Sequence, residues 1–177
     1  MVAKALQRFK TVPWVLGRQR LGSQIVASRN IEAGSIVWET DFEPRIGAAA
    51  VRSRADRHTI QVRAGLHLNM RALCPGSELV QHSCAPNSRL VFGYLKGPVS
   101  TLKMETTEPV GPHGVLTFDY NTTEWEMSDP FECSCGSKEC AGTVGGYSKL
   151  TLERRERIQG DLSPHIRAMA RRLDIVA

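Results

Sequence analysis

Hydrophobic and polar residues alternate in short segments over most of the chain. Residues 23–29 (SQIVASR) and 35–41 (SIVWETD) show the period of two that is typical of half-buried strands, and Gly34 between them suits a turn. Residues 88–95 and 99–105 repeat the pattern, and the Lys-Gly-Pro between them predicts a hairpin. These segments together predict a mainly β protein.

Two further segments have less regular patterns. Residues 115–121 (VLTFDYN) predict another strand, with Leu116, Phe118 and Tyr120 on one face. Residues 44–58 (PRIGAAAVRSRADRH) carry only a weak signal, and we expect a short helix or a loop there.

The pattern becomes helical near the C-terminus. Ser163 and Pro164 suit a helix N-cap and its first turn. Apolar residues then follow at i, i+3, i+4 and i+7, namely Ile166, Met169, Ala170 and Leu173. An earlier helix over roughly 151–159 is predicted to end at Gly160. The expected architecture is a β-rich domain followed by helices.

The length of 177 residues suits one domain with its own core. No segment approaches the roughly 20 apolar residues of a membrane span, and the N-terminus shows no secretory signal. We therefore expect an intracellular protein, cytoplasmic or nuclear, whose five cysteines are thiols or metal ligands. The net charge is +5, but the basic residues after Lys149 alternate with acidic ones. They predict a solvated helix face rather than a nucleic-acid surface.

Three cysteines lie within the segment FECSCGSKEC, at positions 133, 135 and 140. In a reducing compartment this CxCx4C spacing favours a zinc site over an ordinary turn, because one short turn can supply several thiolates to a tetrahedral ion. A structural zinc needs a fourth ligand. The candidates are Cys74, Cys84 and a histidine such as His82 or His113, and the spacing alone does not choose among them.

Cys84 has a competing interpretation as a nucleophile. His82 lies two residues before it and would share its face on a strand, which is the relationship a catalytic cysteine needs with its base. No other His, Asn or Asp pattern supports a protease-like arrangement, however. The nucleophile interpretation is therefore disfavoured.

Four motifs now occur in order: GSQIVASRNIEAGSIV, LVQHSCAPNS, GVLTFDYN and FECSCGSKECAG. Together they resemble a SET domain with its post-SET zinc segment, a family of protein lysine methyltransferases that use S-adenosylmethionine. The resemblance covers roughly residues 14–147. It implies a β-clip-like SET fold of several small sheets with a knot-like threading. The implied division is a SET domain at 1–130, a post-SET segment at 131–147 and a helical tail at 148–177.

The resemblance also implies roles for individual residues. Tyr120 matches the catalytic tyrosine, and Phe118 matches a channel position where phenylalanine leaves room for di- or trimethylation. The zinc ligands would be Cys84, Cys133, Cys135 and Cys140, which leaves Cys74 as a core residue. Contacts to S-adenosylmethionine would come from Gly22, Ser23, Gln24, Gln81 and His82, with Trp125 and Phe131 as a lid.

Two positions depart from the family pattern. The family has Gly-x-Gly where this chain has Gly22-Ser23-Gln24, and asparagine where it has Gln81. The chain also lacks the cysteine-rich pre-SET segment of many histone-specific members. The expected substrate is a lysine on a protein, possibly a histone, with no membrane partner and no nucleic acid as direct substrate. The departures keep two alternatives open: a SET scaffold acting on a small molecule, and a non-catalytic binding module.

Overall fold

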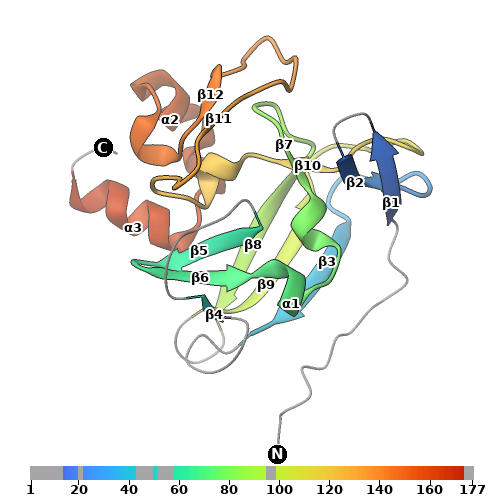
Figure 1. The fold of residues 1–177 in the computed structure, drawn as a ribbon, viewed down its shortest axis with the longest axis horizontal. Helices are drawn as coiled ribbons and strands as arrows, with labels where there is room; N and C mark the ends of the chain where they lie inside the picture. The colour runs from blue at the N-terminus through green and yellow to red at the C-terminus, as the bar shows by residue number, and fades with distance from the viewer. Residues whose placement is uncertain (1–13, 20–21, 43–49, 52–57, 95–98, 174–177) are drawn as a thin grey trace, which may run out of the picture.

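The structure is a computed structural model that describes residues 14–19, 22–42, 50–51, 58–94 and 99–173. The described strands form five small sheets, and the longer helices lie together on one side of the molecule (Figure 1). None of the helices in these ranges is long and apolar enough to cross a membrane. The mainly β architecture with C-terminal helices agrees with the sequence prediction.

Two sheets have three strands each. One has the order β3 (Ile36–Asp41), β9 (Val99–Thr106), β8 (Ser88–Tyr94), and all of its pairs are antiparallel. The other has the order β4 (Ala50–Val51), β6 (Leu66–Asn69), β5 (Thr59–Arg63). The pairing of β8 with β9 confirms the predicted hairpin.

The remaining sheets have two strands each. β1 (Trp14–Gln19) pairs antiparallel with β2 (Gly22–Ala27), and β11 (Phe131–Glu132) pairs antiparallel with β12 (Thr143–Val144). β7 (Gln81–His82) pairs in parallel with β10 (Thr117–Phe118). The predicted strands at 23–29 and 35–41 are thus confirmed as β2 and β3, but they belong to different sheets.

The helices are short. The α-helices are α1 (Met70–Leu73), α2 (Leu152–Ile158) and α3 (Pro164–Arg172). The 3-10 helices are η1 (Ser77–Leu79), η2 (Tyr120–Thr122), η3 (Tyr147–Lys149) and η4 (Gln159–Asp161). The predicted C-terminal helices are confirmed, with Gly160 lying in η4 just after α2. On α3, Ser163 caps the N-terminus and Ile166 and Ala170 are buried, whereas Leu173 is 56% exposed.

The strand predicted at 115–121 is wrong in its extent. Only Thr117 and Phe118 pair as a strand, and the chain turns into η2 at Tyr120. The physical reason is Asp119, whose carboxylate accepts the backbone N–H of Asn121 and so caps a helical turn instead of continuing the strand. Of the segment 44–58, most lies outside the described residues.

Two hydrophobic clusters make up the core. The main cluster joins the sheets and includes Ile25, Leu68, Leu102, Met104 and Leu116. The second cluster holds the helical tail and consists of Tyr147, Leu150, Ile158, Leu162, Ile166 and Ala170, with Trp125 packed against it. Backbone hydrogen bonds from Tyr147 to Glu124 and from Ser163 to Thr122 join this tail to the segment that follows Tyr120.

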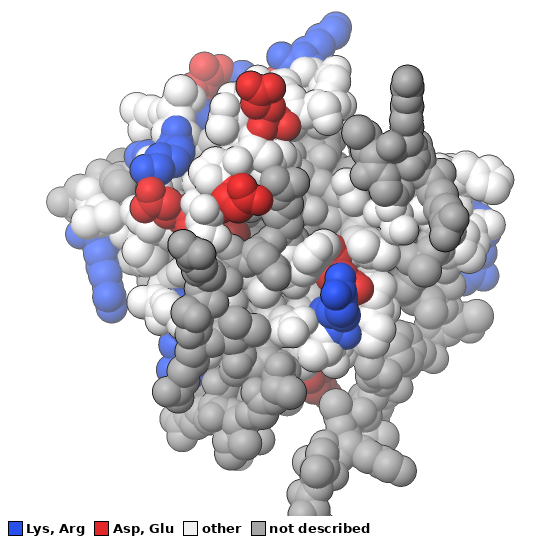
Figure 2. Space-filling view, viewed as in Figure 1, with Lys and Arg blue, Asp and Glu red and all other residues white. Residues whose placement is uncertain are grey.

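The charged side chains of the described residues are mixed on the face shown in Figure 2, with lysines and arginines beside aspartates and glutamates. On α2, for example, Arg157 pairs with Glu153 at 2.6 Å and with Glu139 at 3.1 Å. This arrangement agrees with the solvated helix face that the sequence predicts.

Candidate active site and cysteine cluster

The parallel pairing of β7 with β10 brings two motifs together. Gln81 is in register with Thr117 and His82 with Phe118, so the QHSC segment runs beside LTFDY. Asn87 strengthens this junction: its Nδ2 donates to the Val115 carbonyl at 2.8 Å and its Oδ1 accepts the Thr117 N–H at 3.0 Å. The amide of Asn87 therefore replaces ladder hydrogen bonds that two short strands cannot make.

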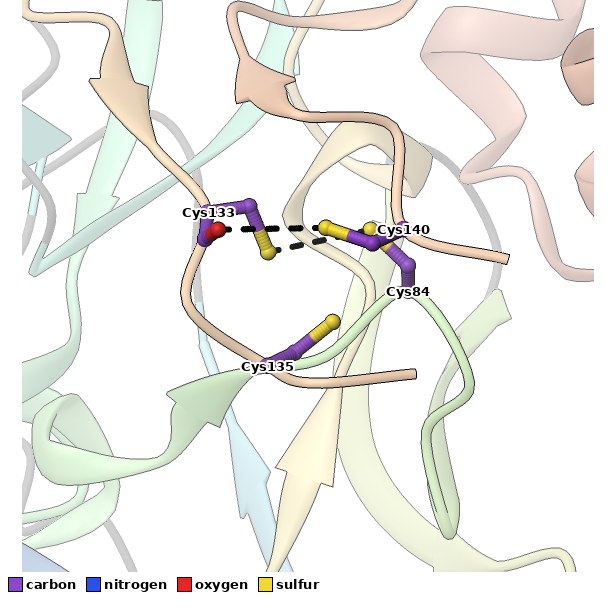
Figure 3. A group of neighbouring side chains, drawn as sticks. All are labelled: Cys84, Cys133, Cys135 and Cys140. Carbon is purple, nitrogen blue, oxygen red and sulfur yellow. Dashed lines mark hydrogen bonds between the residues drawn. The ribbon is translucent and has the colours of Figure 1, made fainter. Parts of the chain in front are cut away.

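Four cysteine side chains meet beside this junction. The Sγ atoms of Cys84, Cys133, Cys135 and Cys140 all lie within 4.8 Å of one another (Figure 3). Sequence spacing left the fourth member open, and the structure brings Cys84 to that place. Cys74 lies in the main core instead, and His113 sits in an exposed turn at φ 65°.

The cysteine cluster has the dimensions of a tetrahedral thiolate site. The Sγ atoms of Cys84 and Cys133 are 3.8 Å apart. Thiolates at the usual zinc–sulfur distance would be separated by about 3.8 Å in a regular tetrahedron. Two hydrogen bonds from backbone N–H groups hold the turn around it, from Cys133 to the Gly142 carbonyl at 2.7 Å and from Ala141 to the side-chain Sγ of Cys84 at 3.3 Å.

The charge that the four thiols can carry depends on whether a cation is bound between them. Burial raises the pKa of Cys84 to about 11 and also raises the pKa of Cys133. Burial acts in the same direction on Cys135, but hydrogen bonding with Ser137 helps to lower its pKa to about 6. The four sulfurs therefore cannot all be thiolates at neutral pH unless a cation compensates their charge. The residues fit a divalent ion with tetrahedral sulfur coordination.

His82 connects the cysteine cluster to Tyr120. Its Nδ1 accepts the Tyr120 backbone N–H at 3.1 Å, so the ring proton belongs on Nε2, which lies 3.4 Å from Cys84 Sγ. Burial lowers the pKa of His82, which agrees with a neutral ring. A histidine that donates to a metal-binding thiolate is a typical outer-shell partner.

Tyr120 sits in an aromatic cluster. Its ring lies 4.8 Å from that of Phe118, 5.3 Å from that of His82 and 6.2 Å from that of Phe131, measured between centroids. The Tyr120 hydroxyl donates to the Val80 carbonyl at 2.6 Å. Because β11 begins at Phe131, this cluster joins the segment before the cysteines to Tyr120.

A pocket opens beside Phe118 and Tyr120. The space inside it that a water-sized sphere can reach is about 20 Å³. Its apolar lining comes from Ile60, Met70, Val80, Phe118 and Met127, and its polar lining includes His58, Glu78 and Glu124.

Glu124 is the buried acid of this pocket, only 4% exposed. Its Oε1 accepts the Gln61 N–H at 2.8 Å, and its Oε2 lies 3.3 Å from His67 Nε2. Burial raises the pKa of Glu124, against the opposing effect of His67.

The residues predicted to contact a cofactor do not all lie beside Tyr120. His82 and Phe131 lie beside Tyr120, whereas Trp125 packs 5.7 Å from the Tyr147 ring in the second core cluster. Gln81 is exposed, and its amide donates back to the Leu79 carbonyl at 3.1 Å. Gly22, Ser23 and Gln24 begin β2, with Ser23 exposed and Gln24 buried.

Sequence reasoning missed one buried ion pair. Arg154 NH2 lies 2.6 Å from Asp119 Oδ2, and the same nitrogen donates to the Cys84 carbonyl. The alternation of basic and acidic residues after Lys149 predicts a solvated face for the arginines of this helix. Only the position of Arg154 opposite an aspartate that precedes the motif tyrosine distinguishes it, and that is a tertiary relationship.

No family model matches the chain, but it is similar to several curated proteins, among them two methyltransferases. The methyltransferase flvH of Aspergillus flavus is 33% identical over 110 residues, which cover 60% of this chain and 55% of flvH. The histone-lysine N-methyltransferase ash1 of Drosophila melanogaster is 25% identical over 116 residues, which cover 66% of this chain and 5% of ash1. The matched region thus spans about half of the first relative and a small part of the second.

A solved structure resembles the fold. The methyltransferase domain of human histone-lysine N-methyltransferase SETMAR superimposes with a TM-score of 0.54 at 15% sequence identity, covering 73% of this chain and 56% of that chain. At this identity the likeness concerns the fold, and it agrees with the arrangement that the sequence motifs predict.

Proposed function

The chain has the SET-domain fold, and on that basis we propose that it transfers methyl groups from S-adenosylmethionine to a lysine side chain of a protein. The two curated relatives described above are named as methyltransferases, one of them for histone lysine. The proposal gives the residues around Tyr120 the role of the reaction centre.

The observation that carries this proposal is the lining of the pocket at Phe118 and Tyr120. Its walls are mostly apolar, and they include the carboxylates Glu78 and Glu124. A lysine side chain has the matching chemistry, with an aliphatic stem and a cationic end. The apolar walls suit the stem, and the carboxylates attract the ammonium group.

The reaction requires a neutral amine. A free lysine at neutral pH is neutral only on the order of one part in a thousand. The apolar walls increase this fraction by desolvating the ammonium, against the carboxylates, which favour the charged form and act in binding. Tyr120 contributes through its hydroxyl oxygen. In the proposed reaction the hydroxyl donates to the Val80 carbonyl, and its oxygen accepts a hydrogen bond from the incoming nitrogen and orients it.

S-adenosylmethionine would supply the electrophilic methyl group on its sulfonium sulfur. The residues proposed to hold it are Gly22, Ser23 and Gln24 at the start of β2, Gln81 and His82 on β7, and Phe131 as one wall. Trp125 is the weakest member of the predicted set, because its ring packs with Tyr147.

The metal is proposed to be Zn²⁺, held by Cys84, Cys133, Cys135 and Cys140. Four thiolates make a closed structural site with no position left for substrate. Its role would be to fix the turn after Phe131 against β7. Reduced thiols and the histone-methyltransferase relative favour a nuclear or cytoplasmic location.

A second candidate function is favoured by the two glutamines. Gln81 turns its amide to the Leu79 carbonyl, and Gln24 occupies a position where the family has glycine. With these two glutamines, the proposed S-adenosylmethionine site would instead serve methylation of a small molecule, or the chain would bind a partner without transferring a methyl group.

The test is calorimetric titration of zinc-reconstituted protein with S-adenosylmethionine, followed by labelled methyl transfer to histones and to lysine-containing peptide arrays. The matched variant is Gln24→Gly with Gln81→Asn. Micromolar binding with label on lysine supports the proposal. Binding without protein labelling favours the small-molecule alternative, and binding only in the variant means that the natural chain has lost its donor site.

A further inference from the structure

We propose that Arg154, on helix α2 and outside every motif of the catalytic region, is a positioning residue that holds the metal-binding turn and the Tyr120 turn in one fixed relation. This inference rests on the proposed function for its catalytic consequence. Its structural basis is one guanidinium group that contacts both turns at once.

Arg154 differs from the other arginines of α2. It is 8% exposed and reaches the surface carboxylate of Glu139 only at 3.8 Å, whereas Arg157 is exposed and pairs with Glu139 at 3.1 Å and with Glu153 at 2.6 Å. Arg155 donates to the backbone carbonyls of Tyr147 and Ser148 within the tail. Arg154 alone among these three is directed away from the tail, toward the junction of β7 and β10.

One contact of Arg154 is with Asp119, which is 3% exposed. Asp119 Oδ2 receives the guanidinium at 2.6 Å, while Oδ1 accepts the N–H and the Nδ2 of Asn121 at 3.0 and 2.8 Å. Asp119 therefore has its charge compensated by Arg154 and its geometry fixed by η2. Tyr120 is the first residue of η2, so a displaced Asp119 carboxylate would move Tyr120 with it.

The other contact is with the backbone of Cys84, whose carbonyl accepts from the same nitrogen. Cys84 is in turn joined to His82 through its sulfur, and His82 Nδ1 holds the Tyr120 N–H. These contacts form a closed ring of interactions through Arg154, Asp119, Tyr120, His82 and Cys84. Removing Arg154 opens this ring and leaves a buried carboxylate without its cation.

The test uses the full chain, zinc-reconstituted, with Arg154→Met, the conservative Arg154→Lys, and the matched control Arg157→Met. Zinc release to a chelator, S-adenosylmethionine affinity, and kcat and KM on a labelled lysine substrate are measured for each. For Arg154→Met we expect kcat to fall roughly 10- to 100-fold with little change in KM, because a misplacement of about 1 Å can cost that much. Zinc release should accelerate by about 10-fold or more.

Arg154→Lys should recover part of both losses, because one ammonium can still reach one of the two acceptors. Arg157→Met should match the natural chain. A folded Arg154→Met variant with unchanged kcat and zinc release would overturn the proposal. If that variant does not fold, Asp119→Asn with Arg154→Met removes both buried charges together, and unchanged values in it would overturn the proposal equally.

Zinc release keeps this test separate from the proposed function. If the natural chain methylates nothing, the proposed function fails, while accelerated zinc release in Arg154→Met still supports the positioning role. If the natural chain transfers methyl groups but Arg154→Met has the same kcat and the same rate of zinc release, only the positioning role fails.

Discussion

His82 and Tyr120 are joined twice, by a 3.1 Å hydrogen bond from the Tyr120 N–H to the imidazole Nδ1 and by an edge contact of their rings at 5.3 Å. The second nitrogen of His82 faces Cys84 Sγ at 3.4 Å. One imidazole therefore fixes the backbone of the proposed catalytic tyrosine and a sulfur of the proposed metal centre. A displacement of Cys84 should therefore shift Tyr120 through the His82 imidazole.

Replacing Cys84 by serine should remove one of four metal ligands. We expect Cys84→Ser to hold less than one zinc per chain and to lose order around 133–140, because the remaining three thiolates leave the tetrahedron incomplete. Metal analysis by mass spectrometry measures the first effect and hydrogen exchange the second. Cys74→Ser is the control, since Cys74 lies in the main core and should keep a full zinc complement. A full complement in Cys84→Ser would exclude it as a ligand.

Replacing Tyr120 by phenylalanine removes the hydroxyl and its hydrogen bond to the Val80 carbonyl. We expect methyl transfer to fall by at least on the order of 100-fold, since the amine loses the acceptor that orients it. The affinity for S-adenosylmethionine should stay close to that of the natural chain, and stability should drop by only about 1 kcal/mol. Single-turnover transfer and calorimetry separate these effects. A fully active variant would remove Tyr120 from the mechanism.

Adding a hydroxyl at Phe118 should limit the product. The Phe118 ring lies 4.8 Å from Tyr120 and lines the pocket. A phenol there would occupy space and bind a water where a methylated nitrogen must rotate. We expect the natural chain to produce di- or trimethyl-lysine and Phe118→Tyr to stop at monomethyl-lysine, as read by mass spectrometry of a product peptide. Identical product distributions would contradict this role.

Tyr147 offers a test of stability against pH. Its hydroxyl is fully buried and has no hydrogen-bond partner among the described residues, and burial raises its pKa despite the opposing charge of Arg155. Tyr147→Phe should therefore keep or raise the free energy of unfolding at neutral pH, by up to about 2 kcal/mol.

Alkaline pH should widen this difference. As pH rises through about 10, tyrosine ionises in the unfolded chain while Tyr147 in the folded chain stays protonated, so the natural protein loses stability and Tyr147→Phe is spared that loss. Urea unfolding on both sides of that pH measures it. Parallel declines in the two proteins would show that Tyr147 ionises as readily folded as unfolded.

Most strands and helices could be predicted from local sequence patterns. The points at which one element ends and the chain turns into the next could not. Alternation is enough to predict β8 and β9, and a proline after a capping serine is enough to predict α3. The end of the strand at Phe118 was missed because the pattern VLTFDYN continues past it. Asp119 stops the strand by capping η2, and its buried charge is acceptable only because Arg154 lies opposite.

The candidate site divides in the same way. The motif resemblance placed Tyr120, Phe118 and the four cysteines in one region, and the structure brings these residues together. The supporting residues Asn87 and Arg154 were not predicted, because their importance lies in partners distant in the sequence. The resemblance implies Trp125 as a lid residue, and this stays a prediction; in the structure its ring packs 5.7 Å from that of Tyr147 in the tail.

The contact of Arg154 with Cys84 spans 70 residues of sequence, and that with Asp119 spans 35. During synthesis from the N-terminus, the four clustered cysteines and Tyr120 are all made before the helix that carries Arg154. A nascent chain can therefore gather its cysteines around an ion while its reaction centre is still unfixed. The proposed metal site would then form first. The proposed methyl transfer at Tyr120 would begin only once α2 has left the ribosome and docked.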